Sequence, residues 1–254
     1  MSNEELQEIL DEKFNEFNKE EFIETDPIQI PKMFSDKNNI EISAFLAATI
    51  AWGNRKMIIR NSLKLMELMD NNPYDFITNH QEKDLNVFNG FVHRTFNDID
   101  CKFFIKSLKN IYTNHNSLES IFVDSFAKNK EIKQSIIDFR NIFFEIDYPQ
   151  RTTKHLANVE KNSAAKRVNM FLRWMVRKDK HGVDFGIWDI PSSELMMPLD
   201  VHSGNVSRKL GLLNRTQNDW KAVYELTTRL KDFDKKDPVK YDFALFGMGV
   251  FDKF

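Results

Sequence analysis

Residues 197–202 read Met-Pro-Leu-Asp-Val-His and lead into a segment that stays basic and apolar as far as Leu213. Pro198 interrupts the preceding element, because a proline nitrogen has no hydrogen to donate. Asp200 is then placed to cap a new helix, since its carboxylate can accept hydrogen bonds from the unpaired N–H groups of the first turn. The apolar residues that follow recur at helical spacing. An ordinary helix cap is therefore one interpretation of Asp200.

A second segment upstream carries a lysine at the start of another helical pattern. Residues 164–172 read Ala-Ala-Lys-Arg-Val-Asn-Met-Phe-Leu. Together with the Leu-Asp-Val-His order, this segment resembles the helix-hairpin-helix DNA glycosylases of the endonuclease III superfamily. The resemblance implies that Asp200 is the catalytic carboxylate and that Lys166 is the attacking amine of a bifunctional enzyme.

The spacing between Lys166 and Asp200 resembles that of one branch of the superfamily. The gap of 34 residues (200 − 166) is longer than in typical endonuclease III relatives and is similar to that of the archaeal 8-oxoguanine glycosylase branch. Residues 163–251 resemble more closely an uncharacterised bacterial family of unknown function within the same superfamily. This closer resemblance bears on the fold more than on the activity.

The fold that the resemblance implies is all-α, with two helical subdomains and a cleft between them. We expect residues 1–254 to form one glycosylase-like domain of two interleaved subdomains, with a helical barrel over roughly 55–160 and the lysine and aspartate helices over 163–213. Composition agrees with long helices, because only 8 Gly and 7 Pro interrupt 254 residues. The 23 Phe predict a phenylalanine-rich core.

Apolar periodicity predicts the individual helices. A helix ending near 176 should carry Arg167, Arg173 and Arg177 on faces other than its buried one. Residues 82–97 fit either a helix or a buried irregular segment. The predicted helices span residues 3–20, 39–52, 55–70, 99–112, 131–145 and 164–176, and others begin after Ser117, Asp200, Asp219 and Asp237.

Several classes of protein are excluded by composition. The single Cys101 cannot form an intramolecular disulfide, and it cannot supply the four thiolates of an iron–sulfur cluster. The six His are dispersed, so we expect no metal and no other cofactor. No apolar run approaches the roughly 20 residues of a membrane span, and the N-terminal segment is acidic rather than signal-like. We therefore expect a cytoplasmic monomer with no membrane partner.

Charge is unevenly distributed, although the net charge is only −2. Residues 1–40 carry 4 basic and 11 acidic side chains, whereas residues 151–180 carry 9 basic and 2 acidic ones. Such a basic region fits a phosphate-binding face, and a solvated helix surface is the alternative. The superfamily hairpin normally binds phosphate through a glycine-rich turn, but residues 155–162 contain no glycine. We expect side chains to replace it, the candidates being Lys161, Ser163, Arg167 and Arg208, with Ser163 also capping the helix of Lys166.

Three further residues are candidates for a base pocket. Trp52 precedes a Gly-Asn turn where related glycosylases probe the DNA stack, and a core tryptophan at a helix end is the alternative. Trp188 lies in the insertion-like loop 178–196 that we expect to cover the site. Asp242 interrupts an apolar segment and resembles an acidic residue of the archaeal 8-oxoguanine base pocket. A first-turn acid that stabilises a helix dipole is the alternative for Asp242.

The function implied by the resemblance is excision of an oxidised purine, such as 8-oxoguanine, from double-stranded DNA by a DNA N-glycosylase with AP-lyase activity. The enzyme would turn the damaged base out of the duplex before cleaving its bond to the sugar. Asp200 would stabilise positive charge on that sugar. Two alternatives remain open at this point, namely a DNA-binding relative without catalysis and a helical adaptor that binds another protein through its acidic N-terminal helix.

Overall fold

The computed structural model describes residues 2–254 and divides the chain into two compact units. One unit is continuous and spans Thr25–Ala157, and the other combines Met1–Glu24 with Asn158–Phe254. The continuous unit includes residues 27–49 because they contact the two helices that follow them. The described chain is predominantly helical, as predicted, and its one sheet is a two-stranded hairpin.

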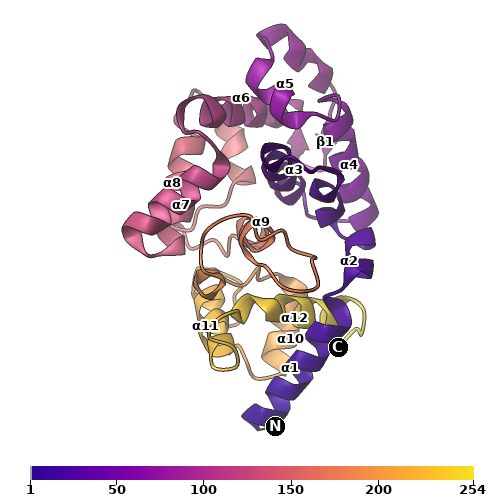
Figure 1. Ribbon diagram of the computed structural model, residues 1–254, viewed down its shortest axis with the longest axis vertical. Coiled ribbons are helices and arrows are strands. Elements are labelled where there is room, and N and C mark those ends of the chain that lie inside the picture. The colour runs from indigo at the N-terminus through magenta and orange to yellow at the C-terminus, as the bar shows by residue number, and fades with distance from the viewer. Residues whose placement is uncertain (1) are drawn as a thin grey trace. The chain divides into compact units, whose positions relative to one another are not determined.

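The continuous unit is built around α3 (Lys37–Thr49), whose residues 40–49 are all buried. It contacts α4 (Arg55–Glu67), α5 (Pro73–Asn79) and α7 (Leu118–Asn129), which lie around it in Figure 1. Phe45 of α3 packs against Phe104, Phe139 and Phe143, so the core is phenylalanine-rich as predicted. The other elements are η1 (Pro27–Gln29), η2 (Pro31–Met33), η3 (Glu82–Phe88), β1 (Val92–His93), β2 (Phe96–Asn97), α6 (Asp98–Asn114), α8 (Ile132–Phe143) and η4 (Gln150–His155).

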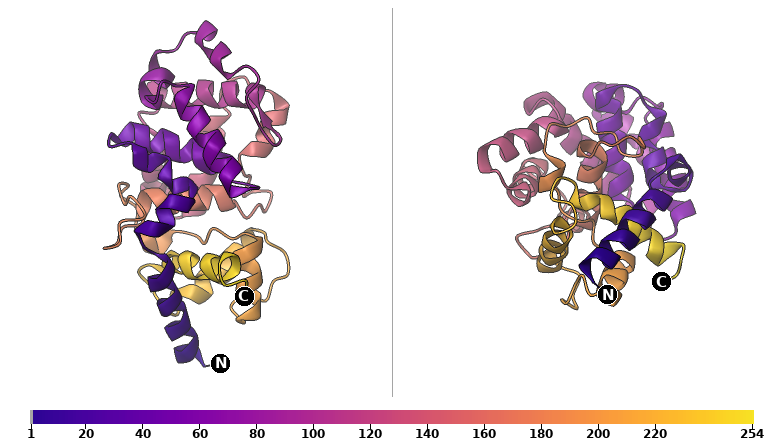
Figure 2. Two further views of the ribbon diagram at one scale, coloured as in Figure 1. Left: turned by 90° about the vertical axis from the view of Figure 1, so that its right-hand side faces the viewer. Right: turned by 60° about the horizontal axis from the view of Figure 1, so that its bottom comes forward.

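The discontinuous unit is centred on α12 (Tyr241–Val250), which packs between α1 (Asn3–Phe17) and α10 (Val201–Lys209), as Figures 1 and 2 show. Two glycines of α12 permit this close approach. A Cβ at Gly247 would lie 2.1 Å from the Phe17 ring, and one at Gly249 would lie 3.1 Å from the Cβ of His202. The remaining elements are α2 (Glu20–Thr25), α9 (Lys166–Val176), η5 (Ser192–Glu194), α11 (Trp220–Lys231) and η6 (Pro238–Lys240).

Local sequence signals located the helix starts well. The side chains of Ser117, Asp200 and Asp219 each accept hydrogen bonds from the first turn of the helix that follows. One prediction was wrong, because Ser163 does not cap α9, whose N-cap is Ala165 without a side-chain bond. Asp237 occupies the N-cap position before Pro238, as predicted, but its carboxylate binds Arg177 and makes no cap bond.

Residues 82–97, which fitted two structures, form η3 followed by the β1–β2 hairpin. The predicted helix over 3–20 ends earlier, at Phe17, and a separate short helix begins at Glu20. Among the residues that the structure describes, no helix combines the length and apolar character that crossing a membrane requires.

Candidate active site

The structure brings Lys166 and Asp200 together. Lys166 is the first residue of α9, and its Nζ lies 3.9 Å from Oδ2 of Asp200. The side chains are 26% and 22% exposed, so the pair is open to solvent on one side. The Sδ of Met170, one turn along α9, lies 3.5 Å from the same Nζ. An amine and a carboxylate therefore share one partly exposed site.

Hydrogen bonds hold Asp200 in place and give its two carboxylate oxygens different roles. Oδ1 accepts from the N–H groups of His202 (2.9 Å) and Ser203 (3.0 Å), while the hydroxyl of Ser203 accepts from the Asp200 N–H. The side-chain amide of Asn218 donates to the Asp200 carbonyl (2.9 Å). Since Oδ1 caps the helix, Oδ2 is the oxygen that faces Lys166. The helix-cap and catalytic interpretations of Asp200 are thus compatible.

Asp242 belongs to a buried ionic network that adjoins this pair. Its carboxylate is paired with Arg173, whose Nε also donates to Asp184 (3.2 Å). The Arg173 guanidinium lies 4.2 Å from the centre of the Phe243 ring, a cation–π geometry. Burial raises the pKa of Asp242 to about 6, against the opposing effects of Arg173 and Lys166, with Asp200 adding to the rise. Asp242 is therefore electrostatically coupled to both residues of the pair.

The network continues through Arg177, one turn further along α9. This arginine is 1% exposed and binds Asp184 (3.0 Å), Asp237 (2.9 Å) and Asp179 (2.6 Å). Burial alone would lower the pKa of Arg177, but the three carboxylates raise it above its usual value. The prediction that Arg173 and Arg177 lie on faces away from the core was wrong, because the carboxylates that surround them make burial tolerable.

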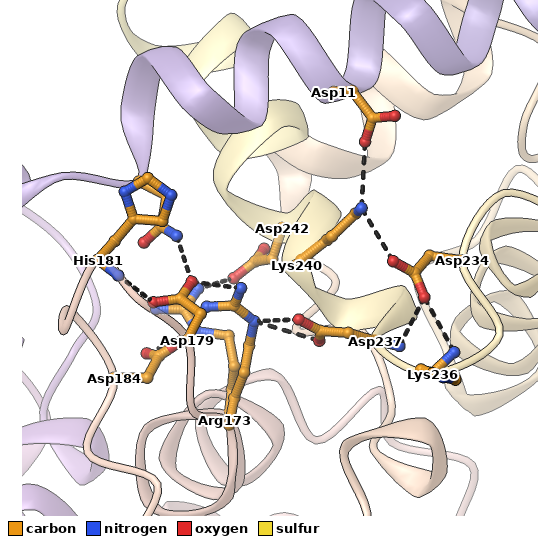
Figure 3. Close-up of polar contacts among 12 residues, drawn as sticks. Asp11, Arg173, Asp179, His181, Asp184, Asp234, Lys236, Asp237, Lys240 and Asp242 are labelled. Atoms are coloured by element: carbon orange, nitrogen blue, oxygen red, sulfur yellow. Dashed lines mark hydrogen bonds and ion pairs between the residues drawn. The ribbon is translucent and has the colours of Figure 1, made fainter.

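Figure 3 shows how the polar contacts spread across the unit, with Lys240 lying between Asp11 and Asp234. Arg173 extends towards Asp184 and Asp242 in the same view. The carboxylates come from α1, the loop 178–196 and the segment before and within α12. These contacts tie α9 to segments far away in the sequence.

Trp188, a predicted pocket residue, packs against the helix that carries Lys166. Its ring meets Phe171 edge to face at 5.2 Å, and the backbone N–H of Trp188 donates to the Met175 carbonyl (3.0 Å). The side chain is 4% exposed, so its packing role is established while its contact with a base stays a prediction.

The glycine-free turn before α9 is formed by other residues. Asn162 (φ 63°) and Ala165 (φ 49°) adopt the left-handed conformation that glycine favours. Ser163 pairs with Asp219 in an antiparallel bridge, and the Asn162 side-chain amide donates to the Asp219 carboxylate (2.8 Å). Arg215 and the first turn of α11 lower the pKa of Asp219 well below its usual value. The turn is therefore anchored to α11 without glycine.

The candidate phosphate ligands have different surroundings. Lys161 is exposed on the turn. Arg208 donates to the Arg215 carbonyl (2.8 Å) and the Asn218 side chain (2.6 Å), so it braces the loop after α10. Burial lowers the pKa of Arg167 to about 10, which leaves its guanidinium charged at neutral pH. The exposed Lys161 thus remains the most accessible of these cations.

Trp52 belongs to the continuous unit, where it is half-buried beside two histidines. Its ring lies 5.0 Å from that of His93, edge to face, and 6.0 Å from that of His155. The His155 Nε2 lies 3.1 Å from the Asp100 carboxylate. Neither histidine was singled out from the sequence, because the six His are dispersed along the chain.

Sequence reasoning also missed Arg173 and Asp184 as part of the site. Arg173 follows Lys166 by seven residues, which places both on a similar face of α9. That spacing, combined with three acids in residues 179–189, was the available signal. Among the residues that the structure describes, no group of three or more His, Cys, Asp or Glu side chains has metal-binding geometry.

Comparison with known proteins places the chain in a family without assigning a reaction. A family model described as a protein of unknown function, DUF2400, matches residues 26–251. No curated protein and no solved structure matches the chain. Since the matched region covers most of the 254 residues, the chain belongs to the DUF2400 family.

Proposed function

We propose that this protein is a DNA glycosylase with AP-lyase activity that excises an oxidised purine, such as 8-oxoguanine, from double-stranded DNA. The observation that carries the proposal is the 3.9 Å approach of the Lys166 amine to the Asp200 carboxylate at a partly exposed site. These are the two residues that the sequence resemblance pairs. The buried network around Arg173 supports the proposal, because it holds α9 and α12 against the site.

The proposed reaction begins with attack by the uncharged Lys166 amine on the anomeric carbon of the extruded nucleoside. The new C–N bond forms while the bond to the base breaks, and the base leaves with the electron pair and takes up a proton. The sugar then opens to an imine with Lys166. Loss of a proton from C2′ expels the 3′ phosphate by β-elimination, and water releases the enzyme.

Asp200 acts through its charge in this scheme. Positive charge develops on the sugar as the base leaves, and a fixed carboxylate nearby lowers the energy of that state. Two N–H bonds to Oδ1 fix the orientation of the group. The oxygen that faces Lys166 is thus preorganised for the sugar that the amine attacks.

The choice of an oxidised purine rests on two features of the chain. The 34-residue spacing of Lys166 and Asp200 and the acidic residue at 242 are similar to the archaeal 8-oxoguanine branch. Asp242 is 6% exposed and is electrostatically coupled to the pair. A carboxylate at this depth is suited to accept a hydrogen bond from a purine N–H.

Borohydride trapping tests the proposal directly. Wild-type protein is mixed with duplexes that carry 8-oxoguanine or an abasic site, and sodium borohydride reduces any imine to a stable covalent complex. We expect a trapped band with wild type and none with Lys166→Ala. Lys221→Ala is the matched control, because Lys221 is an exposed lysine on α11 of the same unit.

Each outcome decides a different part of the proposal. A band that persists in Lys166→Ala would move the nucleophile to another amine. The absence of a band with both substrates would refute the lyase step. Direct measurement of base release would then separate a monofunctional glycosylase from a DNA-binding relative without catalysis.

A further inference from the structure

A second group of residues, outside the site of Lys166, lies in the continuous unit. It consists of the turn Trp52–Asn54, the first turn of α4 and the β1–β2 hairpin. His93 pairs with Phe96 in the hairpin, so Arg94 and Thr95 form a two-residue loop. We call these three segments the hairpin surface. Gly53, Asn54, Arg94 and Thr95 are all exposed on it.

The backbone of Arg94 is in an unfavourable conformation. Its φ is 54°, in the left-handed region that a long side chain rarely adopts. Thr95 does not share a positive φ. Two-residue loops with a positive φ only at the first position usually have glycine there. An arginine at this position therefore costs conformational energy, and such outliers are often kept for function.

The Arg94 side chain is held against the turn that follows Trp52. A Cβ on Gly53 would lie 2.9 Å from a terminal nitrogen of Arg94 and 3.0 Å from its Cδ. Gly53 itself has a φ of 100°, so both its conformation and its lack of a side chain are needed. The guanidinium thus lies directly beside the turn.

His93 fixes the hairpin to the same turn. It is 2% exposed, and its Nε2 donates to the Trp52 carbonyl (3.1 Å). Its Nδ1 accepts from the Asn61 side-chain amide (2.9 Å). This pair of bonds requires the neutral imidazole with its hydrogen on Nε2. The tryptophan ring packs edge to face on the imidazole, so Trp52 and Arg94 are held next to each other.

The charge of the hairpin surface is uniformly positive. Residues 42–66 and 90–97 contain five cations and no Asp or Glu. Among the described residues, no carboxylate lies within ion-pair distance of Arg94, Lys56 or Arg60. The nearest acid in sequence, Asp98, accepts a hydrogen bond from the Gly90 N–H. Exposed cations beside an aromatic ring are suited to a nucleic-acid strand, since they pair with phosphate while the ring stacks on a base.

We propose that Arg94 is a phosphate-binding residue that the hairpin and Gly53 hold beside Trp52, so that both side chains contact one strand of duplex DNA. The identity of the ligand rests on the proposed function. The placement of Arg94 and Trp52 rests instead on the contacts of Gly53 and His93 described above.

Replacing Arg94 with glycine separates binding from folding. The change removes the guanidinium and also relieves the positive φ, so a purely structural arginine and a ligand-binding one predict opposite results. We expect the Arg94→Gly Tm to equal or exceed that of wild type. We expect its affinity for DNA to fall, as measured by fluorescence anisotropy with a labelled duplex that carries a tetrahydrofuran abasic-site analogue.

Salt dependence identifies the lost contact as phosphate. Titrations between about 50 and 200 mM salt should show the slope of log K against log salt falling in magnitude by about 0.9 in Arg94→Gly, which is the loss of one phosphate contact. Arg94→Lys keeps the charge and should retain most of the slope. Lys128→Ala is the matched control, since Lys128 is an exposed cation on α7, and it should leave the slope unchanged.

The outcomes distinguish this inference from the proposed function. A wild-type slope in Arg94→Gly, or a lower Tm with unchanged affinity, would overturn the role of Arg94 and leave Lys166 trapping unaffected. A reduced slope in a protein that forms no trapped complex would support the DNA contact and refute the lyase. Failure of the wild type to bind the duplex would overturn both.

Discussion

Replacing Arg173 with methionine removes the cation from the buried network while keeping an apolar chain of similar length. Arg173 is 4% exposed, and it is the ion-pair partner of Asp242. Asp184 retains Arg177 at 3.0 Å, but Asp242 loses its charged hydrogen-bond donor. Removing one partner of a buried ion pair costs about 3–5 kcal/mol, so we expect Arg173→Met to lower the free energy of unfolding by this amount at pH 7.

The pH dependence of this loss can be worked out from Asp242. Burial raises its pKa to about 6 in the wild type, where Arg173 opposes the shift. Without Arg173 the pKa should rise further, so that the carboxyl is largely neutral at pH 7 in the folded variant. A carboxyl whose folded pKa is raised stabilises the protein at low pH, and this contribution is lost as the pH rises through the folded pKa.

Unfolded Asp242 is ionised at both pH 7 and pH 5, because its ordinary pKa is 3.8. Between these values the variant therefore gains stability over the whole interval, whereas the wild type, with its pKa of about 6, gains it mainly below pH 6. The difference in unfolding free energy should narrow by on the order of 1 kcal/mol at pH 5.

Urea unfolding followed by circular dichroism at pH 7 and pH 5 measures both quantities. Arg229→Met is the matched control, because Arg229 forms a partly exposed pair with Asp232, and its loss should be below about 1 kcal/mol at either pH. A cost for Arg173→Met that is equally small at pH 7, or equally large at both pH values, would refute the reasoning.

Three other changes test separate parts of the structure. Asp200→Asn should keep the helix cap, because Asn caps as well as Asp, while single-turnover excision on an 8-oxoguanine duplex falls by roughly a hundredfold or more; unchanged excision would remove the carboxylate from the mechanism. Gly247→Ala should cost about 1–3 kcal/mol in urea unfolding, since its Cβ would meet Phe17 at 2.1 Å, and more than Gly249→Ala, whose Cβ has 3.1 Å to its nearest neighbour. Burial raises the pKa of the Cys101 thiol well above its usual value, so this cysteine should react with a thiol reagent only after denaturation, and rapid labelling of folded protein would contradict its burial.

Features set by nearby residues were predictable from the sequence. Asp200 and Asp219 cap helices because a short polar side chain bonds to N–H groups two or three residues away. Local sequence signals also identified the end of α9 at Val176, but the helix begins at Lys166 rather than directly after Ser163. The family resemblance paired Lys166 with Asp200, and the fold does bring these two side chains together.

Features set by distant residues were not predictable in this way. Arginines are rarely buried, so the pattern of α9 placed Arg173 outside the core. Its partners come from the loop at Asp184 and from Asp242, 69 residues away. No local pattern reports such a pairing. Ala165 is a similar case, since nothing in its identity indicates a left-handed residue at the start of a helix.

The hairpin at residues 92–97 could not be predicted from the spacing of apolar residues. Phe88, Phe91 and Phe96 are all buried, but their spacing matches neither a helix nor a regular strand. Their positions follow from packing between neighbouring elements, for example the edge-to-face contact of Phe96 with His155. A role for Arg94 could not be seen until the loop conformation was known.

The division of one unit between the two ends of the chain has a consequence for its biosynthesis. The Gln7 side chain donates to the Phe233 carbonyl across 226 residues, and α1 packs on α12. A ribosome makes α1 well before α12, so the apolar face of α1 stays without its partner until α12 has been synthesised. Residues 25–157 are complete long before then and can fold independently in the meantime. During synthesis α1 is therefore a natural client for chaperones, and mutations that slow closure of the unit should lower the yield of protein in cells before they change the stability of the finished molecule.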